Sequence, residues 1–185
     1  MTAQPFRLSL GWFFYEGGVN SMKSLIVYCS SHGTTEKVVG ILSEHLDGEV
    51  VSVDLKRDKT TFDLNDFDAV MIGGSIHAGQ IQRSIKKFIH SYHVDLMEKR
   101  LGLFLVCMRE GEMAVEQFNN AFPVELRKNS DAMGLFGGEF LVSKMNFFER
   151  QIVKKVDGII SDQSKLDVEA IIEFASKMNP LKSMV

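Results

Sequence analysis

The hydrophobic positions of the chain follow two patterns in alternation from Met22 onward. Short runs that are almost continuously apolar are typical of strands buried on both faces, and five are present: Ser24–Cys29, Val50–Val53, Ala69–Gly73, Leu101–Met108 and Ala132–Phe136. Between the runs, apolar residues recur at helical spacing. Strands that alternate with helices favour an α/β fold with a parallel sheet over an α+β fold.

The helical spacing predicts three amphipathic helices, each with one apolar stripe. The stripes consist of Val38, Ile41, Leu42 and Leu46, then Ile81, Ile85, Phe88, Ile89 and Tyr92, and finally Val168, Ile171, Ile172 and Ala175. The last helix is expected to end before Asn179-Pro180. No internal repeat is visible, so we expect one domain.

The segment Phe140–Gly158 is less regular and predicts a turn and an additional helix. The apolar face of this helix is surrounded by basic residues between Lys144 and Lys155. Two interpretations stay open. The apolar stripe packs on the sheet, or the helix makes a peripheral membrane contact at anionic lipid or binds an apolar partner.

Composition and charge exclude several functional classes. The chain has 185 residues, of which 45% are hydrophobic and 24% charged, and its formal charge of −3 gives no footprint for nucleic acid. Two cysteines are too few for a disulfide scaffold or a four-cysteine zinc site, and we expect no metal centre. No apolar run approaches the ~20 residues of a spanning helix. We expect a cytoplasmic protein, at the inner face of the cell membrane if the 144–155 helix is interfacial.

The first 21 residues differ from the rest, since they hold five of the 18 aromatic residues, including the only tryptophan, Trp12. Arg7 and the short apolar stretch after it lack a good cleavage site, which argues against a signal peptide. Glu16-Gly17-Gly18 can be encoded as GAA GGA GGN, a purine-rich ribosome-binding sequence placed three codons before Met22. We therefore hypothesise that residues 1–21 are a translated or non-native leader and that residues 22–185 form the domain.

The loop after the first strand carries the most informative chemistry. Ligands of doubly wound sheets bind beyond the carboxyl ends of the strands. Here Ser30-Ser31-His32-Gly33-Thr34-Thr35 leads directly into a helix, and hydroxyls with backbone N–H groups at a helix N-terminus suit a phosphate. The chain lacks G-x-x-x-x-G-K-[ST] and G-x-G-x-x-G, and Thr35 stands where a phosphatase loop built on Cys29 needs an arginine. A loop without Lys or Arg favours a phosphate monoester bound by neutral donors.

This loop resembles the phosphate loop of the flavodoxin family, commonly [ST]-x-[ST]-G-x-[ST], with His32 in place of the usual hydroxyl residue. The resemblance covers the succession of elements over residues 22–178. It implies FMN as the cofactor, with its phosphate bound by Ser30, Ser31, His32, Gly33, Thr34 and Thr35. It also implies a flavodoxin-like, doubly wound, five-stranded parallel sheet of order 2-1-3-4-5 with helices on both faces.

Two further loops correspond to those that flank the flavin ring in that family. The resemblance assigns Ser75, Ile76, His77, Ala78 and Gly79 to one side of the ring, and Cys107, Met108, Arg109, Glu110 and Gly111 to the other. From Met22 onward the chain has no tryptophan, so Ile76 or His77 must cover the ring. This leaves more room for a substrate and favours an enzyme over a pure electron carrier. His77 is the nearest candidate for a catalytic base, and a solvated loop histidine is the alternative.

Two segments suggest a narrower resemblance. Val70–Gly79 is similar to the V-I-G-A-S-I-R-Y-G turn of the flavodoxin-type, quinone-dependent protoporphyrinogen IX dehydrogenases, with His-Ala in place of Arg-Tyr. Gly137–Phe140, followed by Met145–Arg150 and a Lys-rich helix, is similar to a second signature of that family. The resemblance implies that FMN oxidises a porphyrinogen-like substrate and passes electrons to a quinone or another redox partner. A flavodoxin-type electron carrier and a non-catalytic domain that binds a phosphorylated ligand are the alternatives.

The implied strand order also bears on the two cysteines. It places Cys29 and Cys107 on strands one and four with strand three between them. Two strand steps of ~4.8 Å exceed the Cα separation that a disulfide tolerates. We expect two reduced thiols.

Overall fold

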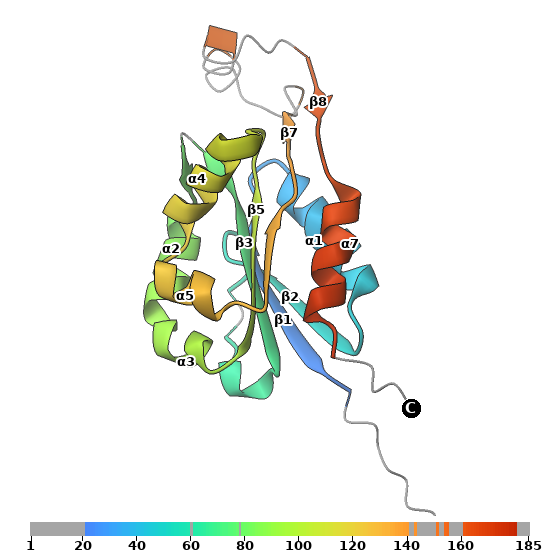
Figure 1. Cartoon of the computed structure of the whole chain (residues 1–185), viewed down its shortest axis with the longest axis vertical. Helices are drawn as coiled ribbons and strands as arrows, with labels where there is room; N and C mark the ends of the chain where they lie inside the picture. Colours follow the sequence, from blue (N-terminus) through green and yellow to red (C-terminus); the bar gives the residue numbers. More distant parts are fainter. Residues whose placement is uncertain are drawn as a thin grey trace, which may run out of the picture.

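The computed structural model of the protein describes residues 21–59, 61–77, 79–140, 143, 151, 154–155 and 161–180. Helices cover both faces of a central sheet, with residues 34–45 and 168–178 on one side and the helices within residues 83–129 on the other (Figure 1). Residues 1–20 of the predicted leader and nearly all of the predicted helix within residues 144–156 lie outside the described residues. The leader and the membrane contact through Lys144–Lys155 therefore stay predictions.

Five parallel strands form the sheet in the order β2-β1-β3-β5-β6. They are β1 (Lys23–Cys29), β2 (Glu49–Asp54), β3 (Ala69–His77), β5 (Arg100–Val106) and β6 (Ala132–Leu135). A sixth strand, β4 (Gln80–Ile81), pairs with β3 in antiparallel orientation. Counted without β4, the order is the predicted 2-1-3-4-5, and the expected flavodoxin-like α/β fold is confirmed.

Most of the helices lie in crossovers between parallel strands. They are α1 (Thr34–His45), α2 (Arg83–Ser91), α3 (His93–Met97), α4 (Gly111–Ala121) and α5 (Val124–Asn129), and the crossover from β2 to β3 contains a 3-10 turn at Leu64–Asp66. The last helix, α7 (Val168–Met178), follows the last parallel strand. Within the described residues, no helix has the length and apolar character needed to cross a membrane.

The third strand is longer than its sequence predicts. It continues beyond Gly73 to His77 and returns as β4, with Ile76 opposite Ile81 and His77 opposite Gln80. Gly79 has a φ of 78°, which allows the chain to reverse tightly. The loop expected over Ser75–Gly79 therefore begins as the end of β3, and Ile81 lies on β4 rather than on the helix.

The fourth predicted strand is shorter than Leu101–Met108, because β5 ends at Val106. The N–H of Cys107 donates to the carbonyl of Gly137, 2.8 Å away, instead of continuing the pairing with a neighbouring strand. Cys29 and Cys107 are both buried free thiols, as expected, and β3 lies between their strands.

The sheet separates two apolar layers, since successive strand residues point to opposite faces. Ile72 and Leu103 belong to the layer beneath α2 to α5, whereas Met71 and Phe104 belong to the layer beneath α1 and α7. The stripes predicted for α1 and α2 are buried or half-buried.

The stripe predicted for α7 is partly wrong. Val168 and Ile172 are 44% and 39% exposed, and the buried face consists of Ile171, Phe174, Ala175 and Met178. Phe174 and Met178 lie over Gly102 of β5, where an added Cβ would be 2.6 Å from the Phe174 ring and 3.0 Å from the Met178 sulfur. Because Gly102 has no side chain, the large side chains of Phe174 and Met178 fit against the sheet, and this face of α7 is the buried one.

A second, two-stranded sheet extends beyond one end of the central sheet (Figure 1). It pairs β7 (Glu139–Phe140) with β8 (Gln163–Ser164) in antiparallel register. We call residues 137–140 and 163–167 the β7–β8 arm. At its base Gly137 has a φ of 66°, and a Cβ there would be 1.8 Å from the Lys165 carbonyl oxygen, so no side chain fits.

Candidate functional site

The three loops predicted to carry the site lie at one edge of the sheet. Cys29 of β1 is opposite Gly74 of β3, and Ser75 of β3 is opposite Val106 of β5. Segments 30–35, 75–79 and 107–111 therefore emerge side by side at the carboxyl ends of the strands, where ligands bind in doubly wound folds. Ala78 lies outside the described residues.

The first loop begins α1 with a glycine in the left-handed region. Gly33 has a φ of 96° and caps the helix, and its N–H donates to Ser30 Oγ over 3.1 Å. Within the described residues, no side chain caps the N-terminus of α1. The backbone N–H groups of the first turn and the helix dipole thus create a site for an anion.

The hydroxyl residues of this loop divide into two groups. Ser30 and Thr35 are each 1% exposed and Thr34 is 8% exposed, so they form the base of the loop. Ser31, His32 and Gly33 are half-buried and form its outer side, where Lys56 Nζ lies 3.3 Å from Ser31 Oγ. The loop itself contains no Lys or Arg, but the ammonium group of Lys56 lies next to it.

Asp54, at the end of β2, lies beneath the same loop and was not among the predicted site residues. Its side chain is buried, and Oδ1 accepts hydrogen bonds from the N–H of Ser30 (3.4 Å) and of Lys56 (2.9 Å). Arg57 Nε is 3.7 Å from Oδ2, an ion pair that is too long for a hydrogen bond. The signal in the sequence was its position, because Asp54 directly follows the strand Val50–Val53, which was expected to lie beside the first strand.

Gln82 connects the first loop to the hairpin and was also missed. Its Oε1 accepts from the N–H of Ser75 (3.1 Å), and its Nε2 donates to Cys29 O (3.2 Å) and Ser75 Oγ (2.8 Å). An added Cβ at Gly74 would be 2.4 Å from Gln82 Oε1, and one at Gly73 would be 2.1 Å from the Phe104 ring. The two glycines therefore leave room for this amide and for the core.

Ile76 and His77 have different surroundings. Ile76 is half-buried and packs against the apolar layer beneath α2 to α5. His77 is exposed, with Nε2 3.1 Å from Ser75 Oγ and its ring centroid 5.7 Å from that of His32. Of the two residues expected to cover a ring, His77 is the one that lies beside the first loop.

The third loop combines a buried anchor with exposed residues. Cys107 is 5% exposed, and burial raises the pKa of its thiol, which keeps it protonated at neutral pH. Met108 is half-buried, and Arg109, Glu110 and Gly111 are exposed. Glu110 pairs with Lys165 of the β7–β8 arm over 3.1 Å. Cys107 therefore supports the loop, while the next four residues form its accessible part.

Comparison with known proteins agrees with this fold. The family model described as Flavodoxin domain matches residues 25–167. The chain belongs to this family. A flavodoxin from Megasphaera elsdenii in its two-electron reduced state is 15% identical, with a TM-score of 0.52 over 84% of this chain and 97% of that one. Oxidised Flavodoxin 1 from Bacillus cereus is 17% identical, with a TM-score of 0.50 over 84% and 96% of the two chains.

A relative found by sequence comparison has a name that states a specific reaction. Protoporphyrinogen IX dehydrogenase [quinone] from Leishmania major is 24% identical to this flavodoxin domain in an alignment of 172 positions that covers 84% of this chain and 74% of that protein. The sequence resemblance to flavodoxin-type, quinone-dependent protoporphyrinogen IX dehydrogenases is thus matched by a named relative.

The flavodoxin domain also has a carboxylate next to α1 that sequence reasoning missed. Glu139 of β7 accepts hydrogen bonds from Lys37 Nζ (2.8 Å), Ser164 Oγ (2.9 Å) and the hydroxyl of Thr34. Burial alone would raise the pKa of Glu139, but these hydrogen bonds and the charge of Lys37 hold it below the usual value of 4.5. In the sequence, the Gly137–Phe140 segment supported a family resemblance, but nothing in it indicated that Glu139 contacts α1.

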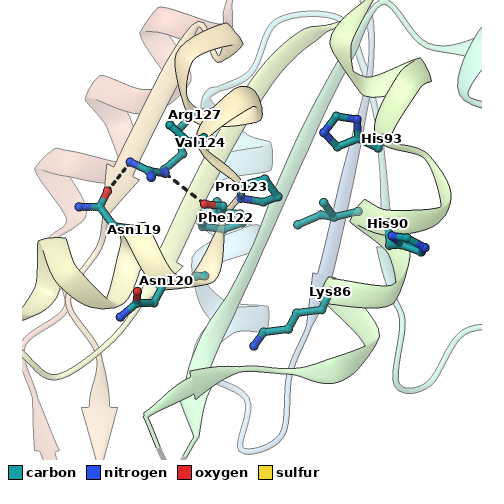
Figure 2. A pocket seen from close by; sticks show the side chains of 11 residues that line it. Lys86, His90, His93, Asn119, Asn120, Phe122, Pro123, Val124 and Arg127 are labelled. Carbon is teal, nitrogen blue, oxygen red and sulfur yellow. Dashed lines mark hydrogen bonds between the residues drawn. The ribbon is translucent and has the colours of Figure 1, made fainter.

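The helical layer of the flavodoxin domain contains a separate groove of ≈ 540 Å³ between α2–α3 and α4–α5. Figure 2 shows Lys86 and His90 on one wall and Arg127 and Asn119 on the other. Arg127 donates to Asn119 Oδ1 over 2.6 Å and to Phe122 O over 3.1 Å. None of the residues that line the groove belongs to the three loops, so we place the candidate redox site at the loops.

Proposed function

We propose that this flavodoxin domain is an FMN-dependent oxidoreductase that oxidises protoporphyrinogen IX or a related reduced compound and passes the electrons to a quinone. The observation that carries the proposal is the arrangement of the loops. An anion site at the N-terminus of α1 lies beside a glycine-containing hairpin that ends in an exposed histidine. The quinone-linked relative supports the choice of reaction.

The residues of the first loop fit the phosphate of FMN. The backbone N–H groups at the start of α1 are aligned with the positive end of the helix dipole, and Ser30 and Thr35 add hydroxyls at the base. The hairpin 75–79 and loop 107–111 would flank the ring. Bound FMN supplies the redox chemistry by accepting electrons from one compound and delivering them to another.

The exposed residues favour an enzyme over an electron carrier. Segments 75–79 and 107–111 contain no Phe, Tyr or Trp, so a ring between them would stay accessible to a substrate. Ser75 Oγ lies within hydrogen-bond distance of His77 and orients its imidazole. An oriented imidazole that faces solvent is suited to exchanging a proton with a bound substrate.

The first prediction concerns flavin binding and turnover. Purified protein should bind FMN in a fluorescence-quenching titration. After anaerobic reduction, a soluble quinone should re-oxidise it rapidly, and added porphyrinogen should be converted to fluorescent porphyrin. Accumulation of a semiquinone without porphyrin formation would favour the carrier, whereas protein that takes up no FMN would contradict both flavin hypotheses.

Gly33→Val is the matched test of the site itself. Gly33 adopts a φ of 96°, which a β-branched residue does not tolerate without strain. The variant should lose FMN while its circular dichroism stays that of the folded protein. Gly40→Ala is the control, because Gly40 lies on α1 and an added Cβ has no atom within 4 Å. Normal FMN content in Gly33→Val would place the site elsewhere.

A further inference from the structure

An ion pair lies at the same helix end as the proposed phosphate site. Lys37 is one turn into α1, and Glu139 reaches it from the β7–β8 arm, with Nζ and Oε1 2.8 Å apart. The Glu139 side chain is 7% exposed, whereas that of Lys37 is 55% exposed. The carboxylate is therefore the enclosed partner, and the ammonium group faces solvent.

Glu139 also contacts the loop residues directly. It accepts a hydrogen bond from the hydroxyl of Thr34, the residue that follows the glycine cap of α1. Its pKa lies below the ordinary value, so the carboxylate is charged at neutral pH. A fixed negative charge thus lies within one helical turn of Gly33, at an end of the helix where anions are stabilised.

The arm does not depend on this ion pair for its position. Two backbone hydrogen bonds connect the base of the arm to the rest of the domain, from Cys107 N to Gly137 O (2.8 Å) and from Asp167 N to Phe136 O (2.9 Å), and a third, from Lys165 N to Gly138 O (2.8 Å), joins the two segments of the arm. Lys165 also pairs with Glu110. Removing either charge of the Lys37–Glu139 pair should therefore change the local field and leave the arm in place.

We propose that Lys37 and Glu139 are specificity-determining residues for the phosphate group of the ligand, acting with opposite sign. Lys37 attracts the phosphate and Glu139 repels it, so that in the intact pair the two effects largely cancel. The inference rests on the proposed FMN site at this loop. Because the loop contains no Lys or Arg of its own, the balance of charges around it sets how strongly a phosphate monoester is preferred over the same ligand without phosphate.

The other charged side chains near the loop are the same in all of the proposed variants. Glu36 and Arg57 pair over 2.8 Å, and Lys56 contributes a positive charge beside Ser31 in every variant considered. The difference between variants at positions 37 and 139 therefore reports these two side chains alone.

The second prediction is that neutralising each partner shifts FMN affinity in opposite directions. Glu139→Gln leaves Lys37 unopposed and should lower the Kd for FMN roughly three- to tenfold at low salt, whereas Lys37→Gln should raise it by a similar factor. The double variant should lie near the unmodified protein. Riboflavin, which has no phosphate, should bind all four proteins equally, and the spread in FMN affinity should shrink as ionic strength rises.

The exposed pair of Glu173 and Lys177 on α7, also 2.8 Å apart, supplies the matched control, and its two neutralised variants should leave FMN affinity unchanged. If the Lys37–Glu139 pair only stabilises the fold, Glu139→Gln and Lys37→Gln should both weaken FMN binding. That result would overturn the inference. Equal shifts for riboflavin and FMN would overturn it as well. If the unmodified protein binds no FMN, the proposed function fails, whereas FMN binding with no opposite shifts refutes only the role of the pair.

Discussion

At the scale of single residues, two polar side chains hold the loops of this flavodoxin domain in place. Asp54 accepts from the backbone of Ser30, and Gln82 joins the end of β1 to Ser75. Both are buried or half-buried. Buried polar groups that lose their partners cost more free energy than the hydrogen bonds themselves contribute. Each of these side chains therefore helps to hold its loop at the end of the strands.

The third prediction concerns Gln82. Gln82→Leu keeps most of the side-chain volume but leaves the Ser75 N–H and the Cys29 carbonyl without their partner. We expect the free energy of unfolding to fall by roughly 1–3 kcal/mol, measured by urea denaturation. Gln80→Leu, an exposed position on the adjacent strand, should change it by less than about 0.5 kcal/mol. Equal losses in the two variants would mean that the Gln82 hydrogen bonds have no special role.

At the scale of elements, α7 depends on how the arm returns to the domain. Asp167 caps the helix, since its Oδ1 accepts from the N–H of Ala170 over 2.9 Å, and its own N–H donates to Phe136 O. The helix then buries Ile171, Phe174 and Met178 against the sheet and α1. The end of the arm and the start of α7 are therefore joined at one residue.

The fourth prediction tests that cap. Asp167→Ala should destabilise the domain by about 0.5–2 kcal/mol in thermal or urea unfolding, because a helix N–H loses its acceptor. Asp167→Asn keeps an acceptor of similar geometry and should stay within a few tenths of a kcal/mol of the unmodified protein. If the Asn variant loses as much stability as the Ala variant, the charge of Asp167 rather than its cap hydrogen bond is responsible.

At the scale of the whole molecule, two apolar layers surround a sheet that begins immediately after Met22. The carbonyl of Met22 accepts a hydrogen bond from the N–H of Glu49 over 3.0 Å, and β1 starts at Lys23. An added Cβ at Gly48 would be 2.1 Å from that carbonyl oxygen, so the chain at Met22 is already part of the close packing. That translation begins at Met22 stays a hypothesis.

The fifth prediction concerns this start site. Protein expressed from its native upstream DNA should have an intact mass that corresponds to a chain beginning at Met22. Met1→Ala should leave the yield unchanged, whereas Met22→Ala should abolish the shorter product. A mass that includes residues 1–21 would contradict the hypothesis.

Much of the fold and part of the site followed from local patterns in the sequence. The apolar runs predicted all five parallel strands, because strands buried on both faces must be apolar throughout. The family resemblance carried by Ser30–Thr35 implied their order. The end of β3 and the buried face of α7 were predicted less accurately, because the pairing with β4 and the packing over Gly102 depend on neighbours distant in sequence.

The sequence by itself determined the order of the elements and the position of the loop at the start of α1, since both arise from residues close together along the chain. Only the tertiary structure decided which side chains support that loop. Asp54 lies 24 residues from Ser30, Gln82 lies 53 from Cys29, and Glu139 lies 102 from Lys37. Hydrophobic periodicity places residues on a face of a helix or strand, but it contains no information on which distant polar groups then meet.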